Sequence, residues 1–450
     1  MPYDLLIRNG NVVLSNEVKR LDIGINNGKI TALGQVLDGE AKQVVNAEGM
    51  TVFPGMIDVH VHFDEPGREN WEGFETGSAM LAAGGCTTFF DMPLNGIPST
   101  VTKEAFVDKV AVGEAKSHID FGLWGGLVPE NLNDLADLAD AGAIGFKAFL
   151  SPSGNPYFHS VDDESLLEGM KRIAKTGSVL ALHSESAPLV TFLQKEKEAK
   201  GLTGYDDYAE SRPVQAETEA VSRALTFAEV TGCPLHFVHI STVEAVALIQ
   251  AAKKRGQDVT LETCPHYLLY SHEDFRKIGV VGKCAPPLRS EAERSGLVNL
   301  LIQGQIDLVS SDHSPCEWKD KQTDSIFTAW GGISGGQFSL LSAIEIALTH
   351  DLPLTKVADW TAKQPAERFR LTAQKGEIRK GADADLAVVA LDKPEQVTTD
   401  KLYQKNKFSL YEGHVFPSSI QTTINRGTVV YSNADGINGA AAGKWIRPGK

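Results

Sequence analysis

The stretch GMIDVHVHFDEPG, residues 55 to 67, places two histidines two positions apart, at His60 and His62. Successive side chains of a strand point to opposite faces, so these two imidazoles would project from the same face. Imidazoles are common ligands of zinc and similar ions. A solvated strand end also explains a lone His-x-His, so the interpretation depends on which other side chains accompany the pair.

Eight short β-rich runs alternate with helical stretches in the middle of the chain. The runs cover residues 56–63, 86–92, 119–125, 143–149, 178–184, 234–240, 258–264 and 306–312. Segments between them, such as EAVSRALTFAEVTG and VEAVALIQAAKKRG, repeat apolar residues at spacings of three and four, which is typical of helices. Eight strands alternating with helices predict an α/β fold of the (β/α)8 TIM barrel type.

Polar side chains that can bind metals fall on five of these runs, mostly near the end of the run. Chemistry in such barrels sits at the carboxyl ends of the strands. Each side chain alone has an ordinary explanation, such as capping or core packing, but their joint placement favours a metal site. The set is His60, His62, Lys147, His183, His239 and Asp312.

Six positions are more than one tetrahedral site with an open position needs, and they suit two divalent metals about 3.5–4 Å apart. Two cations that close together require an anionic bridge. Lys147 lies in the apolar run GFKAF, where an unpaired ammonium is unfavourable. We therefore predict that carbon dioxide carboxylates Lys147, which turns its amine into a carbamate that bridges the metals.

The two ends of the chain share a sequence pattern that differs from that of the middle. Residues 1–54 and 374–450 contain short alternating strands that break at Asn-Gly or Gly, as in LDIGINNGKITALG and TTINRGTVVYSN. Chain termini often lie close together, so we predict one small β-sandwich domain formed from both chain ends. The barrel then occupies residues 55–373, between the two halves of that domain.

The composition of the 450 residues restricts the class of partner. The net charge of −15 argues against nucleic acid or anionic membranes as binding partners. The sequence contains no run of about 18 apolar residues, so it does not predict a membrane-spanning helix. The five cysteines form no CxxC pair, and the N-terminus carries no secretory signal pattern. We expect a cytoplasmic protein with reduced cysteines, and the net charge says little about a small substrate.

The motifs around these residues resemble those of the amidohydrolase superfamily, in particular its cyclic amidohydrolases: dihydroorotases, hydantoinases with dihydropyrimidinases, and allantoinases. The resemblance spans nearly the whole chain. It rests on PGMIDVHVHFDEPG, DMPLN (91–95), GFKAF (145–149), HSES (183–186), HISTVEAV (239–246), ETCPHYL (262–268), KCAPPLR (283–289), SDHSPC (311–316) and GEIRKGADADL (376–386). It implies a hydrolase with a binuclear centre on the six side chains named above, the split β-domain and a homotetramer.

Within this family the chain is most similar to the allantoinases, through MPLN, SDHSPC and AWGGISG (329–335). Dihydroorotases typically carry an arginine two positions after the second histidine, which binds the substrate carboxylate. This chain has Asp64 there, which would repel that carboxylate. Hydantoinases typically place a tyrosine shortly after the carboxylated lysine, whereas here Phe149 has no hydroxyl and Tyr157 is farther along.

The resemblance implies that the protein opens the ring of allantoin to give allantoate, in purine and ureide catabolism. A hydroxide bridging two metals would attack the ring amide, and Asp312 would act as general base and pass the proton to the leaving nitrogen. Zinc is the expected metal, and cobalt and manganese also suit these N/O ligands.

The resemblance also implies that Asn95 and Ser314 contact the substrate. Turn formation or helix capping is the alternative role for both residue types. A further hypothesis is that Asp64 accepts hydrogen bonds from the ureido tail of allantoin. We expect His266 and His313 to support the site rather than bind metal, and residues 315–332 to form a lid.

Two other functions compete with this prediction. A hydantoinase or dihydropyrimidinase acting on other cyclic ureides would share the metal centre and the ring-opening chemistry. A non-catalytic scaffold relative would keep the fold but lack metal ligands, and here all six ligand positions are filled.

Overall fold

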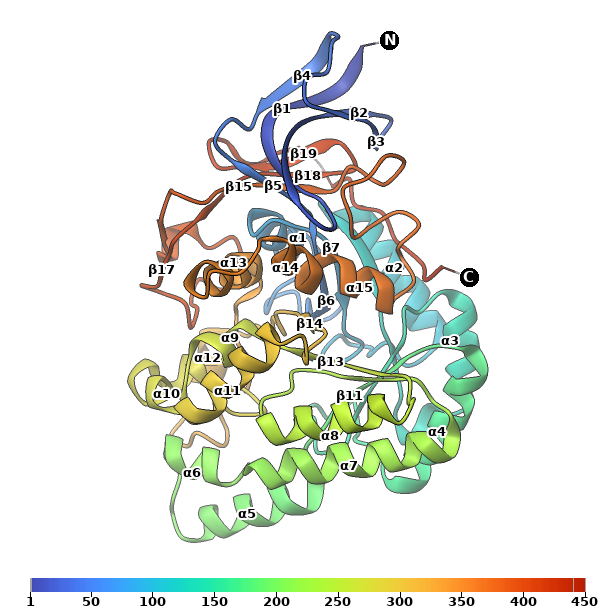
Figure 1. Ribbon diagram of the computed structural model, residues 1–450. Helices are drawn as coiled ribbons and strands as arrows, with labels where there is room; N and C mark the ends of the chain where they lie inside the picture. Colours follow the sequence, from blue (N-terminus) through green and yellow to red (C-terminus); the bar gives the residue numbers. More distant parts are fainter. Residues whose placement is uncertain (1, 440, 450) are drawn as a thin grey trace.

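The structure is a computed structural model that describes residues 2–439 and 441–449 (Figure 1). Parallel strands alternate with helices through the middle of the chain. The two ends of the chain meet in a separate sheet, drawn in blue and red at the top of Figure 1.

Each of the eight predicted runs contains parallel strand. The strands are β6 (Met56–Val61), β7 (Cys86–Asp91), β8 (Asp120–Leu123), β9 (Gly125–Gly126), β10 (Phe146–Phe149), β11 (Leu180–His183), β12 (Leu235–Phe237), β13 (Val259–Thr263) and β14 (Leu308–Val309). They pair in the order β6-β7-β8 in one sheet and β9-β10-β11-β12-β13-β14 in another. The third run is interrupted at Trp124 and contributes to both sheets. The predicted (β/α)8 barrel fold is confirmed.

Helices connect these strands and lie outside them (Figure 1). The main connections are α1 (Phe74–Ala83), α2 (Lys103–Lys116), α3 (Leu135–Ala141), α4 (Asp163–Thr176), α7 (Val214–Thr231), α8 (Val243–Lys254), α11 (Glu291–Ile302) and α13 (Ser339–Thr349). Shorter or inserted helices are α5 (Ala187–Ala199), α6 (Tyr205–Glu210), α9 (Pro265–Leu269), α10 (His272–Ile278), α12 (Trp318–Lys321), α14 (Thr355–Ala358) and α15 (Gln364–Arg368). None of the helices in the described residues combines the length and apolar character that crossing a bilayer requires.

The strands of the barrel direct alternate side chains outward and inward. The outward set packs with the helices in the largest apolar cluster, which includes Leu235, Phe237, Val259 and Leu261. The inward set, with Ile57, Val59, Phe90, Ala181 and Leu308, forms a second cluster together with Trp124 and Phe369. Because strand side chains alternate, His236 of β12 and Glu262 of β13 point into the interior of the barrel.

The sheet at the chain ends contains strands from both termini. Its members are β1 (Tyr3–Val13), β2 (Val18–Asn26), β3 (Lys29–Gly34), β4 (Ala41–Asn46), β5 (Thr51–Pro54), β15 (Leu386–Ala390), β18 (Ser419–Asn425), β19 (Thr428–Ser432) and β20 (Gly436–Ile437). The order is β20-β19-β18-β15-β5-β1-β2-β3, and β4 also pairs with β1. A small separate pair consists of β16 (Glu395–Gln396) and β17 (Val415–Phe416).

The two halves of this sheet join where β5 pairs with β15 in antiparallel fashion, with Phe53 opposite Ala387. The prediction that both chain ends build one small β-domain is therefore confirmed. The structure arranges the strands as one mixed sheet, because β1 pairs in parallel with β4 and β5 and in antiparallel fashion with β2. The predicted boundaries after residue 54 and before residue 374 stay predictions.

A buried ion cluster links this sheet to the amino end of the barrel. The Lys375 ammonium lies 2.8 Å from Asp120 Oδ2, 3.4 Å from Asp383 Oδ2 and 2.5 Å from Asp385 Oδ2. Asp120 begins β8, and Asp385 directly precedes β15. Arg426 adds a contact of 3.1 Å to Asp120 Oδ1. The four charged side chains around Lys375 thus connect the two parts of the fold.

Candidate active site

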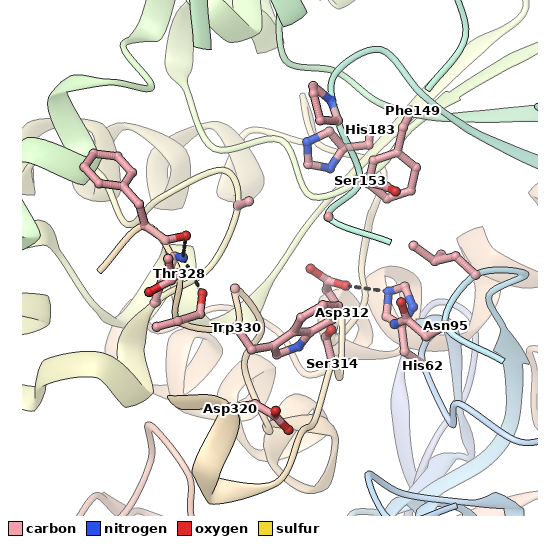
Figure 2. Close-up of a pocket in the computed structure, with 18 of the residues that line it drawn as sticks. His62, Asn95, Phe149, Ser153, His183, Asp312, Ser314, Asp320, Thr328 and Trp330 are labelled. Carbon is pink, nitrogen blue, oxygen red and sulfur yellow. Dashed lines mark hydrogen bonds and ion pairs between the residues drawn. The ribbon is translucent and has the colours of Figure 1, made fainter. Parts of the chain in front are cut away.

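Three of the predicted ligands meet at one point of the barrel. The Nε2 atoms of His60 and His62 lie 3.1 and 3.2 Å from the same oxygen, Asp312 Oδ1. All three side chains are buried, and Figure 2 shows Asp312 pointing toward His62. His60 and His62 share a face because they are two positions apart, and the register of β6 against β7 shifts between Asp58 and Val61, the stretch that contains His60.

Two more histidines extend this group. His183 ends β11, and its Nδ1 atom lies 3.0 Å from Nε2 of His239. The ring centroid of His239 lies 5.5 Å from that of His60, so the four imidazoles form one cluster. His239 and Asp312 have φ values of 39° and 47°, which side chains with a Cβ rarely adopt. Strained backbone of this kind is concentrated at functional sites.

Lys147 is the sixth member of the cluster. It lies within β10 and is fully buried, and its Nζ has no hydrogen-bond partner among the described residues. Its Nζ lies 5.1 Å from the centroid of the Phe149 ring. Burial lowers the pKa of Lys147 to about 8, which increases the fraction of the neutral, nucleophilic amine.

The unpaired atoms of the cluster test whether it fits metal ions. Lys147 Nζ, His62 Nδ1 and His239 Nδ1 are buried without partners within residues 2–439 and 441–449. Buried polar atoms normally have hydrogen-bond partners, so such a group of exceptions is typical of a ligand site. Imidazole and carboxylate donors are the ligand types that divalent transition metals prefer. The donor set therefore fits metal ions, and Lys147 fits the anionic bridge once it is carboxylated.

The protonation states of these groups suit ligation. Burial lowers the pKa of His62 to about 4, and burial together with His183 and Lys147 holds the pKa of His239 well below its usual range. Burial acts to raise the pKa of Asp312, but the nearby imidazoles of His60 and His62 outweigh it and bring the pKa to about 2. Neutral imidazoles and an ionised carboxylate are the forms that bind metals.

All six predicted ligands line one cavity of about 560 Å³. Its walls also include Asn95 and Ser314, which the resemblance assigned to substrate binding. In Figure 2, Asn95, Ser314 and Asp312 lie on one side of the cavity, and His183 and Phe149 lie on the other. The cavity has the size and the mixed lining of a small-molecule site.

Asp64 differs from Asn95 and Ser314, because it is buried and is not among the residues that line the cavity. Its two carboxylate oxygens have no hydrogen-bond partner in the described part of the chain. Burial and the neighbouring Asp91 raise the pKa of Asp64 well above its usual range. Its contact with substrate stays a prediction.

The expected supporting histidines occupy different surroundings. His313 Nε2 lies 3.2 Å from Glu72 Oε2, and its Nδ1 accepts from the backbone of Gly336 at 3.3 Å. His266 is buried, and neither of its ring nitrogens has a partner within the described residues. His313 thus helps to hold the strand end that carries Asp312.

The segment 315–332 forms part of the cavity wall near its mouth. Lys321 Nζ donates to the carbonyls of Trp330 and Gly332, at 2.9 and 2.8 Å. The Trp330 ring packs against Trp71, with 4.6 Å between centroids. The Lys321 bonds hold the segment together internally, and Trp71 connects it to the loop after β6. Its predicted motion as a lid stays a prediction.

Sequence reasoning missed two glutamates that lie directly behind the candidate ligands. Glu262 contacts His60, and Glu185 contacts His183. Both glutamates lie within the motifs ETCPHYL and HSES. A signal was present for Glu262, because a carboxylate at an inward position of a buried strand requires a partner.

Comparisons with known proteins agree with this geometry. A model of the amidohydrolase family matches residues 51–430. The chain is 54% identical to an allantoinase of Bacillus velezensis over 100% of this chain and 98% of that one. It is 47% identical to an allantoinase of Deinococcus radiodurans, over 100% of this chain and 99% of that one.

Solved structures of relatives share the whole architecture. An L-hydantoinase (dihydropyrimidinase) from Arthrobacter aurescens superimposes with a TM-score of 0.96 at 33% identity, covering 99% of this chain and 100% of that one. A D-hydantoinase from Thermus sp. gives a TM-score of 0.92 at 27% identity, with 99% of both chains covered. The chain therefore belongs to the amidohydrolase family, whose members generally depend on a pair of metal ions.

Proposed function

We propose that this protein is a hydrolase of cyclic amides that opens the ring of allantoin and releases allantoate, in purine and ureide catabolism. The observation that supports metal-dependent hydrolysis is the buried, unpaired Lys147 among four imidazoles and a carboxylate. The choice of allantoin is supported by full-length similarity to allantoinases from several bacteria at 41–54% identity.

The proposed metal ligands are the six side chains that line the cavity: His60, His62, Lys147, His183, His239 and Asp312. They would hold two divalent cations, zinc by preference, with cobalt or manganese as substitutes. When bound, such a pair acidifies a water molecule and polarises the carbonyl under attack. Lys147 would contribute as a carbamate, formed when its neutral amine reacts with carbon dioxide.

Asp312 is the proposed general base. Both of its recorded imidazole contacts fall on Oδ1, which leaves Oδ2 to accept a proton from the attacking water. Its low pKa keeps the carboxylate ionised before the reaction. Asp312 would then deliver that proton to the ring nitrogen as the amide bond breaks.

Asn95 and Ser314 are the proposed contacts for the ring and its ureido tail. Asn95 lines the cavity with a φ of 73°, and its Oδ1 lies 3.5 Å from Nδ2 of Asn155. The backbone of Ser314 is held by a bond from its N–H to the carbonyl of Ile333 at 2.9 Å. Asp64 would contribute behind Asn95 as an acceptor. Asn95 and Ser314 hold polar atoms at the wall where a substrate would lie.

The second candidate is a hydantoinase or dihydropyrimidinase, which the structural similarity to such enzymes favours. Against it, Phe149 stacks on His183 at 4.6 Å between centroids and offers no hydroxyl. Tyr157 is exposed and does not line the cavity, and Tyr208, which does, donates its hydroxyl to the carbonyl of Cys284. These observations favour allantoin over the simpler cyclic ureides.

Three further proposals accompany this function. We propose a homotetramer, a cytoplasmic location, and domain boundaries after residue 54 and before residue 374. The location is supported by five cysteines that are all free. A scaffold role is disfavoured, because all six ligand positions are filled and line one cavity.

The test is a side-by-side assay of the protein loaded with divalent metal and bicarbonate. The substrates are allantoin, hydantoin, dihydrouracil and dihydroorotate, and the product of allantoin is identified as allantoate. We expect turnover of allantoin and little turnover of the others. Preference for hydantoin or dihydrouracil would contradict the substrate, and failure to bind metal after reconstitution would contradict the metal chemistry.

A further inference from the structure

Two buried glutamates lie behind two of the candidate metal ligands. Glu262 Oε1 lies 2.5 Å from His60 Nδ1, and Glu185 Oε2 lies 2.9 Å from His183 Nε2. Both glutamates are fully buried. A carboxylate in this position behind a metal-binding histidine fixes the orientation of its ring and raises its basicity.

The two contacts use opposite ring nitrogens. In His60 the carboxylate contacts Nδ1, and Nε2 faces the cluster, 3.1 Å from Asp312. In His183 the carboxylate contacts Nε2, and Nδ1 faces the cluster, 3.0 Å from His239. When a metal ion takes the cluster-facing nitrogen of each ring, the one remaining ring proton lies on the other nitrogen, where the glutamate carboxylate can only accept it.

Glu262 is itself held in place from the interior of the barrel. Its second oxygen, Oε2, lies 3.0 Å from His236 Nε2, and His236 Nδ1 lies 2.8 Å from the Thr260 hydroxyl. All these side chains except that of Thr260 are fully buried. The chain Thr260–His236–Glu262–His60 therefore gives the carboxylate one orientation rather than several.

Glu185 is held by a cation instead. Arg212 donates from Nη1 to Glu185 Oε2, the same oxygen that faces His183. The buried ion pair with Arg212 therefore fixes the carboxylate behind His183.

The other two histidines of the cluster have no such support. His62 Nδ1 and His239 Nδ1 are buried and lack a hydrogen-bond partner in the part of the chain that the structure describes. The carboxylate contact is thus not a general consequence of burying a histidine here. It is confined to one histidine from β6 and one from β11.

We propose that Glu262 and Glu185 are positioning residues that fix opposite tautomers of two ligands: His60 carries its proton on Nδ1 and His183 carries its proton on Nε2. Each ring then presents its remaining nitrogen to a metal ion. This inference rests on the metal-binding part of the proposed function and does not depend on the identity of the substrate.

The first test reads the tautomers directly in the wild-type protein. The zinc-loaded enzyme is prepared with 15N-labelled histidine, and the ring nitrogens are observed by NMR. We expect one zinc-bound histidine protonated at Nδ1 and another at Nε2, each responding to substitution of its own glutamate. Finding the same tautomer in both, or no response to either substitution, would overturn the proposal.

The second test measures metal affinity in Glu262→Gln and Glu185→Gln. The glutamine amide offers both a donor and an acceptor, so it no longer forces one tautomer. Loss of such a supporting carboxylate typically lowers metal affinity by about 10–100-fold. Competition with a chelator for zinc gives the affinity without any use of catalytic activity.

Glu217→Gln is the matched control. Glu217 is as deeply buried as Glu262, but its carboxylate accepts bonds from Ser241 and Thr242 and contacts no candidate ligand. We expect its zinc affinity to remain that of the wild type. If all three variants bind zinc alike, the glutamates do not position the ligands and the proposal is wrong.

Two further measurements distinguish a loss of ligand positioning from a folding defect and from an incorrect substrate. Glu185→Gln leaves Arg212 without its carboxylate, so thermal melting of each metal-free variant checks its fold, and the wild-type NMR measurement needs no variant. Allantoin turnover is measured in the same preparations. Normal zinc binding without allantoin turnover contradicts the proposed substrate, whereas unchanged zinc affinity in the variants with normal turnover contradicts only the positioning role.

Discussion

Two buried lysines of this chain differ in what surrounds the ammonium. Around Lys375, carboxylates of Asp120, Asp383 and Asp385 lie within 3.4 Å. Burial acts to lower the pKa of Lys375, but these carboxylates outweigh it and raise the pKa. Lys147 has no hydrogen-bond partner among the described residues, and burial lowers its pKa to about 8.

The difference separates a structural cluster from a binding cluster. The charges around Lys375 are satisfied by the chain itself, at the amino end of β8 where the end sheet meets the barrel. The polar atoms around Lys147 are left unsatisfied, at the other end of the barrel where the cavity opens. A perturbed, unpaired group in a cavity indicates a site for a ligand, whereas a paired buried charge indicates a contact within the fold.

Replacing Lys147 is expected to give the largest effect on activity. Lys147→Met removes the proposed anionic bridge, and loss of several kcal/mol of charge stabilisation corresponds to about a 10³-fold fall in kcat/KM for allantoin. The thermal melting temperature of the metal-free protein should not fall, because no hydrogen bond of Lys147 is lost. Native mass spectrometry of the wild type should show the added mass of one carbon dioxide. A Lys147→Met variant that keeps its activity would contradict the assignment of Lys147 to a binding cluster.

Replacing Lys375 is expected to give the opposite pattern. Lys375→Met leaves buried carboxylates without their cation, so the free energy of unfolding should fall by about 3–5 kcal/mol. The folded fraction should keep its kcat/KM for allantoin. Denaturant unfolding measures the first quantity, and Lys375→Arg is the control that retains the charge. A variant with wild-type stability would show that the ion cluster is not structural.

The pH dependence of stability, measured in protein stripped of metal and bicarbonate, should also distinguish Lys147 from Lys375. The pKa of Lys147 is about 8 in the folded state against 10.5 ordinarily, so between these pH values the unfolded chain binds more protons. Stability relative to Lys147→Met should therefore rise with pH from 8 to 10.5, by about 3 kcal/mol in total.

Lys375 provides the control for this pH measurement. Its pKa is raised above 10.5, so both states keep the proton below that pH. The stability difference between wild type and Lys375→Met should stay flat from pH 7 to pH 10. If the stability difference changed with pH equally for both lysines, the distinction between a paired and an unpaired lysine would be wrong.

Substitutions in the cavity wall are expected to give the smallest effects. Asn95→Ala and Ser314→Ala each remove one proposed hydrogen bond to substrate, worth about 1 kcal/mol, so KM for allantoin should rise by about fivefold. Asp64→Asn should give a smaller rise, because Asp64 does not line the cavity. Steady-state kinetics with the metal content held constant measure all three. An unchanged KM in Asp64→Asn would remove that residue from the substrate site.

The sequence determined much of the architecture by itself. Alternation and the turns at Asn-Gly predicted the strands, and the eight runs predicted the barrel. The rule that barrel chemistry lies at strand ends was enough to group His60, Lys147 and Asp312 in one site. These features are local or depend on a repeated pattern, so they can be predicted from the periodicity of residues along the chain.

Only the tertiary structure decided which buried side chains meet. The contacts of Glu262 with His60 and of Lys375 with Asp120 join residues separated by 202 and 255 positions. Periodicity predicts that Glu262 points inward, but its partner depends on the register and tilt of neighbouring strands. Those are set by packing of the whole core, which no local pattern records. The sequence therefore predicts the ligands, and the fold decides how each is held.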